Sequence, residues 1–520
     1  MNKRRYIFSS YWLILLFAAV LYGLMSLSDM VWADEAYTLA MIRHPFPEIW
    51  QITAADSHPP LYYFAVKLFS MPFGYSEYSV RLFSGICYLL ILAVGGAQIH
   101  RLFDRKTGLL FMALFVLFPF GLDHAVEARM YALSALAVFL NALFAYRVWL
   151  DNRGLDWAVF TLTGLAAAYT HYFALVAAGM IYGLLFLCCL CKNRKLLKPW
   201  LIASLATVLL YLPWLKCFIS QLAVKVTTEY WIAPITFNSL KEDMLVLLHT
   251  NDSRIYPLLL GLLVAVLFIQ MIIRKDVPAL LALAVPALTM LLGIAASLAV
   301  RPVYVVRYLA PCAPLMIFFL AFGISNIRRE QLFTAVSSVL LVAFFCNLPF
   351  VAASMRPGQN KIGSGFVEDT DRAQAYVMEL SDGIANSHMC QVVAYYQTEK
   401  PIYISETLGA ASPYPNVEEL TAFQPEELDC FAVLTDPDSR PSMYGTEDYE
   451  CTSLGVYHEV YTKADVWLLT RRSAQEAEES PVEEPTEEPT ETEETTEPTE
   501  AAEPSEPTQS TEPTQATDAQ

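Results

Sequence analysis

The chain has little charge for its length. Only 17% of its 520 residues are charged, whereas 55% are hydrophobic. This balance is typical of a membrane protein rather than of a soluble one. Once the cations beside apolar runs are set aside, no stripe of Lys and Arg remains to bind nucleic acid. The sequence also lacks a P-loop and a Gly-x-Gly-x-x-Gly motif, so nothing in it indicates a phosphate-cradling nucleotide site.

Typical metal-ligand spacings are missing as well. The ten cysteines contain no pair of Cys-x-x-Cys motifs, and no His-x-x-x-His motif occurs. Most of the cysteines lie in apolar runs, where they are expected to be small packing residues. Cys390, Cys430 and Cys451 follow the last apolar run, and among them Cys430 and Cys451 are the candidate disulfide.

Residues 1–353 consist mainly of apolar runs, which predict about eleven membrane helices. The first run follows Lys3-Arg4-Arg5 and is interpreted as a retained signal anchor, with cleavage after Ala33 as the alternative. Cationic clusters occur in alternate loops, which predicts a cytoplasmic N-terminus and an extracellular C-terminal region in a multi-pass protein of the cell membrane. The runs cover residues 6–27, 79–99, 108–122, 130–149, 157–173, 174–191, 199–218, 255–273, 277–299, 304–325 and 331–353.

The unusual polar residues gather in the loops that this topology leaves on the outer side. The first outer loop, residues 29–78, holds Asp34, Glu35 and His58, and other outer loops hold Arg129 and Arg307. An ionisable side chain at membrane depth costs about 2.5–3.5 kcal/mol on insertion scales. Their concentration on one side therefore predicts a shared polar cavity.

The composition changes after the last apolar run. Residues 354–472 are predicted to form a small extracellular α/β domain, with strands at 391–396, 401–404, 431–434 and 466–469 and a helix around 370–380. Residues 473–520 repeat Glu-Pro-Thr units and contain 15 Glu, one Asp and no Lys or Arg. With so few apolar residues, this tail is predicted to be disordered.

Several short motifs occur in a recognisable order along the first 350 residues. They are Asp34-Glu35 after the first apolar run, His58-Pro59-Pro60-Leu61-Tyr62-Tyr63, residues 74–82, Glu127-Ala128-Arg129-Met130-Tyr131, Thr170-His171-Tyr172, and Val306-Arg307-Tyr308-Leu309-Ala310-Pro311. Together they resemble the integral-membrane glycosyltransferases of the GT-C fold. The similarity is greatest to the bacterial branch of family 39, which is related to protein O-mannosyltransferases and to the lipid A aminoarabinose transferase.

This resemblance implies a fold and an activity. The fold is an all-α polytopic GT-C-like domain at residues 1–353, with residues 29–78 as the catalytic loop. The activity is inverting transfer of a sugar from a polyprenyl-phosphate donor to an acceptor hydroxyl on the outer face, as part of cell-envelope glycosylation. The acceptor is left open between a protein, a cell-wall polymer and a lipid. Membrane lipids are further expected partners, whereas nucleic acid is not.

The acceptor hydroxyl must lose its proton as it attacks, and a carboxylate is the usual base. Asp34 stands where the family carries its catalytic Asp, so it is the predicted base. Glu35 is the alternative base, or it orients a neighbour. Both acids are also typical of a helix N-terminus, so simple capping of a juxtamembrane helix is the alternative explanation.

Departure of the lipid phosphate builds negative charge, which cations stabilise. Arg129 is the first candidate because a guanidinium binds phosphate through two hydrogen bonds. His58 stands where some relatives have Lys, and Arg307 lies in another outer loop. Glu127 is a candidate partner of Arg129. The weaker candidates for substrate contact are Tyr62, His171 and Lys225.

Three questions stay open at this point. A divalent metal between Asp34 and Glu35 is possible in principle, although no tight ligand cluster surrounds them. A polytopic transporter would also bury charges, but it is expected to show repeated halves and charges in mid-span. A non-enzymatic surface receptor or scaffold would account for residues 356–520 and leave the loop residues without a role.

Overall fold

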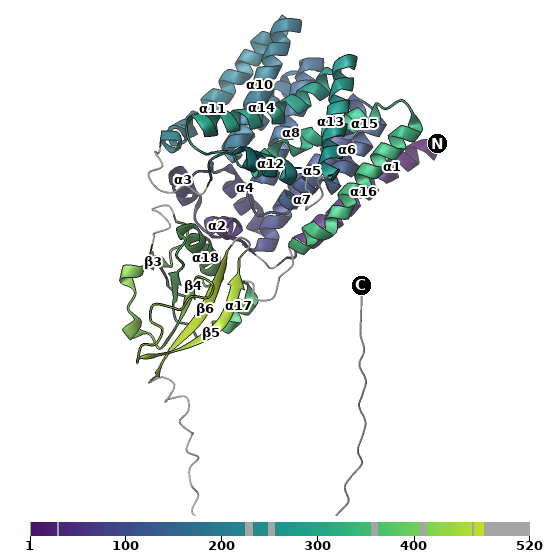
Figure 1. The fold of residues 1–520 in the computed structure, drawn as a ribbon. Helices are drawn as coiled ribbons and strands as arrows, with labels where there is room; N and C mark the ends of the chain where they lie inside the picture. The colour runs from purple at the N-terminus through teal and green to yellow at the C-terminus, as the bar shows by residue number, and fades with distance from the viewer. Residues whose placement is uncertain are drawn as a thin grey trace, which may run out of the picture. The chain divides into compact units, whose positions relative to one another are not determined.

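The computed structural model describes residues 2–28, 31–223, 232–247, 255–354, 362–405, 412–459 and 462–472. Helices dominate as far as residue 354, and the strands all follow (Figure 1). The helices in this first part are α1 (Asn2–Met25), α2 (Ala33–Met41), α3 (Phe46–Ala55), α4 (Leu61–Ser70), α5 (Glu77–Leu102), α6 (Arg105–Leu117), α7 (Pro119–Ala125), α8 (Tyr131–Asp151), α9 (Gly154–Thr170), α10 (Tyr172–Lys192), η1 (Arg194–Leu196), α11 (Leu197–Ala223), α12 (Phe237–Leu247), α13 (Ile255–Arg274), α14 (Val277–Ala299), η2 (Val306–Cys312), α15 (Ala313–Ser325) and α16 (Glu330–Ser354).

Eight helical segments within the described ranges are long and apolar enough to cross a membrane. They comprise α5, α8, α10, α11, α13, α14, α16 and the continuous pair η2 and α15. A ninth span results if α6 and α7, which are bent by 65° at their junction, are counted together. Each of the eleven predicted runs contains a helix, but α9 has only 17 residues, one fewer than a candidate span requires. The polytopic helical class is confirmed.

Close packing between α5 and α6 holds the helix that follows the first outer loop. A Cβ added to Gly108 of α6 would lie 3.0 Å from the carbonyl oxygen of Gly96 on α5. Only glycine lets the two backbones approach this closely, as is common between membrane helices. Phe111, one turn further along α6, stacks on Phe139 of α8 at 5.7 Å between ring centroids. These contacts fix α5 in the bundle.

The first outer loop folds into three short helices, α2, α3 and α4, which the apolar-run pattern did not resolve. Pro60 is the N-cap residue of α4, and its carbonyl accepts the backbone N–H of Phe64 at 3.1 Å. Proline suits the start of a helix because its ring fixes φ and its missing donor is not needed there. In Figure 1 these helices lie between the long helices and the sheet.

A six-stranded sheet follows, with the order β3-β2-β1-β4-β6-β5. Strands β3, β2, β1 and β4 are parallel neighbours, whereas β6 runs antiparallel to both β4 and β5. The elements of this part are α17 (Ser364–Asp369), β1 (Tyr376–Glu379), α18 (Gly383–Tyr396), β2 (Ile402–Ile404), β3 (Val417–Glu419), η3 (Leu420–Ala422), η4 (Pro425–Glu427), β4 (Cys430–Thr435), β5 (Tyr449–His458) and β6 (Lys463–Arg471). The predicted small α/β region is confirmed.

Side chains alternate between the two faces of this sheet, as the twofold repeat of a strand requires. Tyr376 and Met378 of β1 share one core with α18 and with α2, whereas Val377 belongs to a separate core on the opposite face. Through the first of these cores the sheet region packs directly on the helix that carries Asp34. The membrane helices and the sheet belong to one compact unit ending at Ala474, and the predicted disordered tail lies outside the described residues.

Three details of the predicted α/β region are wrong. The predicted strand at 391–396 is the second half of α18, and the predicted helix around 370–380 contains β1. Asp382 caps α18 by accepting the N–H groups of Ile384 and Ala385, so a capped helix overrides the β-branched and aromatic run. The candidate disulfide is also absent: Cys430 and Cys451 are free and lie on β4 and β5, which are separated by β6.

Candidate active site

Asp34 lies in the first turn of α2. One of its carboxylate oxygens, Oδ2, lies 3.7 Å from Nε of Arg129 and 3.4 Å from Nη2 of Arg307. About a quarter of the Asp34 side chain is exposed, against 4% for Arg129 and 22% for Arg307. Three residues from separate loops, all predicted to lie on the outer side, therefore form one charged cluster.

Each arginine has a further contact that fixes its direction. Nη1 of Arg129 donates to the backbone carbonyl of Asp34 at 3.3 Å. The guanidinium of Arg307, in η2, lies over the ring of Trp32 at 5.5 Å from its centroid. A cation over an indole face is favourable, more so where water is partly excluded. Both cations are thus held at the start of α2.

The two arginines set the protonation state of Asp34. Burial alone would raise the pKa of the Asp34 carboxyl, but Arg129 and Arg307 outweigh burial and hold this pKa below its ordinary value. His58 and His388 act in the same direction. Asp34 is therefore ionised at neutral pH, and it can accept a proton from a hydroxyl that enters the cluster.

Glu35 is engaged differently from its neighbour. Its side chain is buried, and Arg81 of α5 donates to both of its oxygens, from Nε at 3.0 Å and from Nη2 at 2.6 Å. The backbone N–H of Ala128 donates to the same carboxylate at 2.9 Å. With both oxygens occupied, the geometry favours the orienting role for Glu35 over that of a base. Arg81 lies in the motif at residues 74–82, but only the folded chain brings it to Glu35.

His58 lies at the end of a short chain of polar contacts. Its Nδ1 is 3.4 Å from Oδ2 of Asp56 and 3.2 Å from the Ser57 hydroxyl. The Tyr37 hydroxyl of α2 donates to the same Asp56 oxygen at 3.0 Å. Burial would raise the pKa of Asp56, but the hydrogen bond from His58 and its charge bring this pKa below the ordinary value. Asp56 thereby ties the His58 ring to the helix of Asp34.

His171 lies beside His58, with 6.0 Å between the ring centroids. Its Nδ1 accepts the backbone N–H of Phe173 at 3.2 Å, so the neutral ring carries its proton on Nε2. Burial lowers the pKa of His171 well below the ordinary value, and His58 and Arg129 add to this effect. His171 is therefore a neutral hydrogen-bond donor.

The other predicted contacts have mixed outcomes. Glu127 pairs with His124, at 2.6 Å between Oε2 and Nδ1, instead of forming the suggested ion pair with Arg129. Tyr62 is fully buried, and no described residue forms a hydrogen bond with its hydroxyl. Lys225 lies outside the described residues. The structure therefore places Arg129 and Arg307 at Asp34, puts His58 close enough to affect its charge, sets His171 beside His58, and gives Glu127 another partner.

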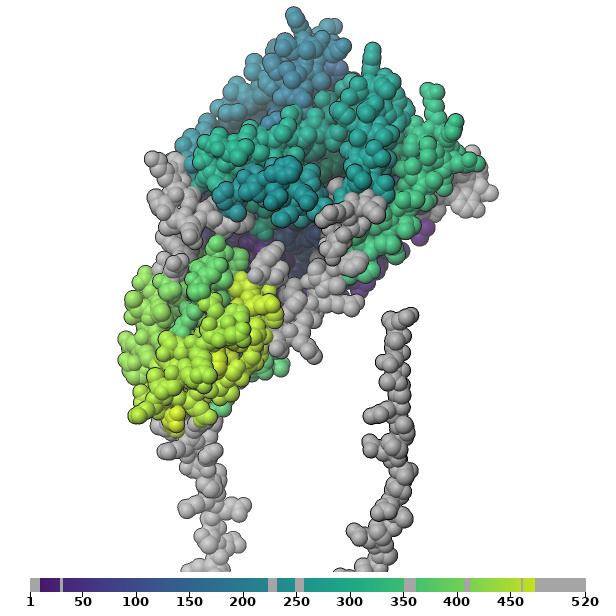
Figure 2. Space-filling view, viewed as in Figure 1, coloured from purple at the N-terminus to yellow at the C-terminus, as the bar shows by residue number. Residues whose placement is uncertain are grey.

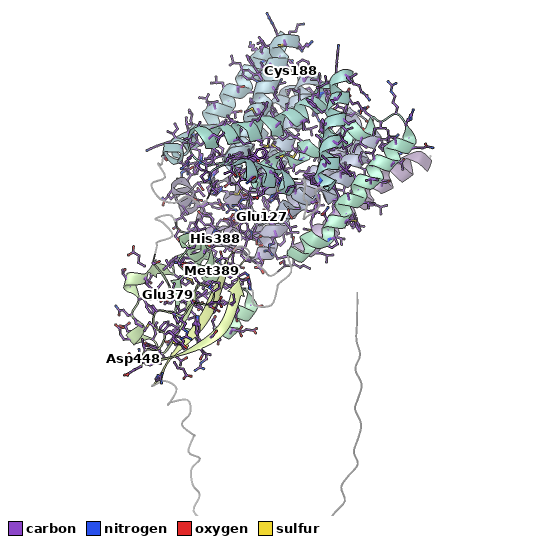
Figure 3. The ribbon with its side chains drawn as sticks, in the orientation of Figure 1. Glu127, Cys188, Glu379, His388, Met389 and Asp448 are labelled. Carbon is purple, nitrogen blue, oxygen red and sulfur yellow. The ribbon has the colours of Figure 1, made fainter. Side chains whose placement is uncertain are left out.

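The sheet region brings two further polar residues to this end of the molecule. His388 lies on α18 and adds positive potential at Asp34. Tyr414 is buried, and its hydroxyl has no hydrogen-bond partner among the described residues. Figure 3 places the His388 label next to that of Glu127, between the long helices and the sheet. Sequence patterns gave no signal for either residue, because both lie beyond the part covered by the family resemblance.

The donor set around Asp34 does not suit a divalent metal. Within the described ranges, no group of three or more His, Cys, Asp or Glu side chains could hold one. The Glu35 oxygens, which would have to share such an ion with Asp34, are already occupied by Arg81 and Ala128. Two guanidinium groups next to Asp34 supply the positive charge instead.

The chain is similar to a known protein family and to solved structures. Residues 57–216 match the family model described as dolichyl-phosphate-mannose-protein mannosyltransferase. No curated protein matches the sequence. The structure is similar to that of ArnT from Cupriavidus metallidurans in the apo state, with 12% identity, a TM-score of 0.58, and coverage of 88% of this chain and 97% of ArnT. The form of ArnT bound to undecaprenyl phosphate gives 12% identity, the same coverage and a TM-score of 0.53.

The family match covers three of the motifs in the active-site cluster, at His58, Arg129 and His171. The structural similarity extends over both the membrane helices and the sheet region. The resemblance indicated by the sequence motifs is therefore confirmed, and the chain is an integral-membrane protein of the GT-C glycosyltransferase fold.

Proposed function

We propose that this protein is an inverting glycosyltransferase, which moves a sugar from a polyprenyl-phosphate carrier to an acceptor hydroxyl at the outer face of the membrane. The observation that carries the proposal is the Asp34 carboxylate held between Arg129 and Arg307. One base and two phosphate-binding cations are the groups that such a displacement needs. The ArnT structure that contains undecaprenyl phosphate supports a lipid-linked donor.

In the proposed reaction, Asp34 takes the proton of the acceptor hydroxyl. The hydroxyl oxygen forms a new bond to the anomeric carbon of the sugar, while the bond from that carbon to the phosphate oxygen breaks. The electron pair of the broken bond leaves with polyprenyl phosphate. Because attack and departure occur on opposite sides of the same carbon, the anomeric configuration inverts.

Arg129 and Arg307 are assigned to the donor phosphate. A guanidinium binds phosphate oxygens in pairs and stabilises the charge that builds on the leaving group. His58 is assigned to the same phosphate, with Asp56 holding its ring, and His171 offers a neutral N–H donor nearby. Glu35 and Arg81 have no direct part in the chemistry and fix the first turn of α2.

The test is sugar transfer by the purified protein from a polyprenyl-phosphate sugar, with the wild type compared to Asp34→Asn. Loss of the base should lower kcat by about 10²- to 10⁴-fold, because this is the usual contribution of general-base catalysis. Asp151→Asn is the matched control, since Asp151 is half-exposed at the far end of α8 and pairs only with Arg153 among the described residues.

Two outcomes would contradict the proposal. Unchanged transfer by a folded Asp34→Asn variant would remove Asp34 from the chemistry. Absence of transfer by the wild type with every polyprenyl-phosphate sugar tried would favour a transporter or a non-enzymatic surface protein instead.

A further inference from the structure

The helix that carries Asp34 is capped by a residue far away in the sequence. The first N–H groups of a helix have no partner within the helix and need an acceptor from elsewhere. At the N-cap of α2, the Trp32 side chain supplies no such hydrogen bond. The Ala33 N–H donates instead to Oε1 of Glu459 at 3.2 Å, across 426 positions of sequence.

Glu459 belongs to the sheet region. It directly follows β5, its side chain is buried, and its own backbone N–H donates to the Thr462 carbonyl at 2.8 Å. A carboxylate at this place satisfies a backbone donor and also faces the positive end of the helix dipole. The sheet region thus supplies the N-terminal cap of the proposed catalytic helix.

The membrane part holds α2 at other points. Nη1 of Arg129 donates to the Asp34 carbonyl, and Arg81 fixes the Glu35 carboxylate. At the opposite end, Nζ of Lys67 donates to the carbonyl of Ile42, the C-cap residue of α2, at 2.6 Å. Among the described contacts, the hydrogen bond from the Ala33 N–H to Glu459 is the one that joins the backbone of the first turn of α2 to the sheet region.

Apolar packing accompanies the cap. Ala33, Ala36 and Ala40 of α2 belong to the same buried core as Met389 and Val393 of α18. In Figure 2 the purple N-terminal residues are visible in a hollow between the teal helices and the green-to-yellow sheet region. The position of α2 therefore depends on both parts of the chain.

We propose that Glu459 is a positioning residue for catalysis, which sets the first turn of α2 and thereby the place of Asp34. The sheet region accordingly helps to place the proposed base. A displacement of about 1 Å in a catalytic group can cost 10²-fold in rate. This inference rests on the proposed function, in which Asp34 is the base.

The experiment compares three variants in the purified full-length protein, with a polyprenyl-phosphate sugar as donor. Glu459→Ala removes the acceptor for the Ala33 N–H, whereas Glu459→Gln keeps a side-chain carbonyl. Tyr395→Phe is the matched control, because it removes another hydrogen bond between the two parts, from the Tyr395 hydroxyl to Oε2 of Glu77 at 2.7 Å, without contacting α2 through that group.

Glu459→Ala is expected to lower kcat by about 10- to 100-fold, with KM for the donor within about 2-fold of the wild type. Glu459→Gln should restore most of kcat, and Tyr395→Phe should match the wild type. If Glu459→Ala does not fold, Glu459→Asp carries the same test, because its carboxylate is one methylene too short to reach the Ala33 N–H.

Three results would overturn the positioning role. The first is equal kcat in Glu459→Ala and Tyr395→Phe. The second is a loss of kcat in Glu459→Gln as large as in Glu459→Ala, while thermal unfolding of both remains as in the wild type. The third is an effect confined to KM for the acceptor. Failure of the proposed function itself is distinguishable, since the wild type would then transfer no sugar.

Discussion

At the scale of the residue, the low pKa of Asp34 raises a chemical question, because a weaker base removes a proton less readily. The contacts that lower the Asp34 pKa also explain how Asp34 can act as a base during the reaction. Arg129 and Arg307 lower this pKa, and both are assigned to the donor phosphate. A bound phosphate would share the two guanidinium groups with Asp34 and weaken their effect on it. Asp34 would then become a stronger base only when the donor is in place.

This coupling predicts two different acid limbs in the pH dependence of transfer. The limb of kcat/KM for the donor reports the free enzyme, and the limb of kcat reports the enzyme with its substrates bound. Asp34 acts in its ionised form, and its folded pKa is lowered, so the kcat/KM limb should lie below the ordinary Asp pKa of about 3.9. The kcat limb should lie at higher pH. Both are measured as initial rates at saturating and at low donor concentration.

Arg307→Gln provides the check on this cause. With one cation removed, the Asp34 pKa in the free enzyme should rise, and the kcat/KM limb should move towards the kcat limb. If the acid limbs of kcat and of kcat/KM lie at the same pH in the wild type, donor binding does not change the Asp34 pKa and the coupling is contradicted. So would an unchanged kcat/KM limb in a folded Arg307→Gln variant.

The sequence was sufficient to predict that Asp34, Arg129 and Arg307 lie close together, because each lies in a predicted outer loop and in a recognisable motif. It was not sufficient to assign their partners. The pairing of Glu35 with Arg81 depends on how α2 packs on α5, which a motif does not encode, whereas Glu127 pairs with His124 only three residues before it. His388 and Tyr414 lie in a part of the chain that the motifs do not cover.

At the scale of the element, α2 and α5 are joined by a buried ion pair, Arg81 with Glu35. Removal of one partner leaves a buried charge without compensation and typically costs about 3–5 kcal/mol. Arg81→Met and Glu35→Leu should therefore each lower the thermal unfolding midpoint of the purified protein strongly. The double variant should be closer to the wild type, because it leaves no unpaired charge.

A second ion pair supplies the control for this prediction. Lys106 and Glu330 lie 2.6 Å apart, but their side chains are 47% and 69% exposed. Exposed pairs contribute about 0–1 kcal/mol, so Lys106→Ala should leave the unfolding midpoint almost unchanged. Equal destabilisation by Lys106→Ala and Arg81→Met would show that burial is not the cause.

Elements were predictable from the sequence where one physical signal dominated. Long apolar runs located the helices of the membrane part, and the strands β2, β4 and β6 followed from short β-prone runs. The signals conflicted at α18, where a β-prone run follows a good N-cap, Asp382. Tertiary packing of α18 on α2 and on the sheet decided this case in favour of the helix.

At the scale of the whole molecule, the charged contacts separate into two groups. Loops predicted to be cytoplasmic meet through Lys106 with Glu330, and through Arg274 with Asn326. The cluster around Asp34 instead draws on the loops predicted to be outside. This separation agrees with the predicted division of the loops into two sides, and the choice of the outer side rests on the distribution of Lys and Arg.

Removal of the acidic tail and removal of the sheet region should have very different effects on kcat. The compact unit ends at Ala474, and the sequence after it contains 15 Glu, one Asp and no Lys or Arg, which accounts for most of the net charge of −18. A chain that stops after Ala474 should keep kcat within about 2-fold of the wild type, because it retains Glu459 and every described contact of α2. A chain that stops after Met355 should lose transfer, since it lacks both the cap and the core partners of α2.

Both truncations are assayed with the same polyprenyl-phosphate sugar, and their thermal unfolding is followed in parallel. A large fall in kcat on removal of the tail alone would mean that the acidic segment acts in the chemical step. Full activity of the chain ending at Met355 would mean that the membrane helices hold α2 without help. Loss of transfer in the shorter chain, together with full kcat in the longer one, is the pattern expected of a catalytic helix that both parts of the molecule position.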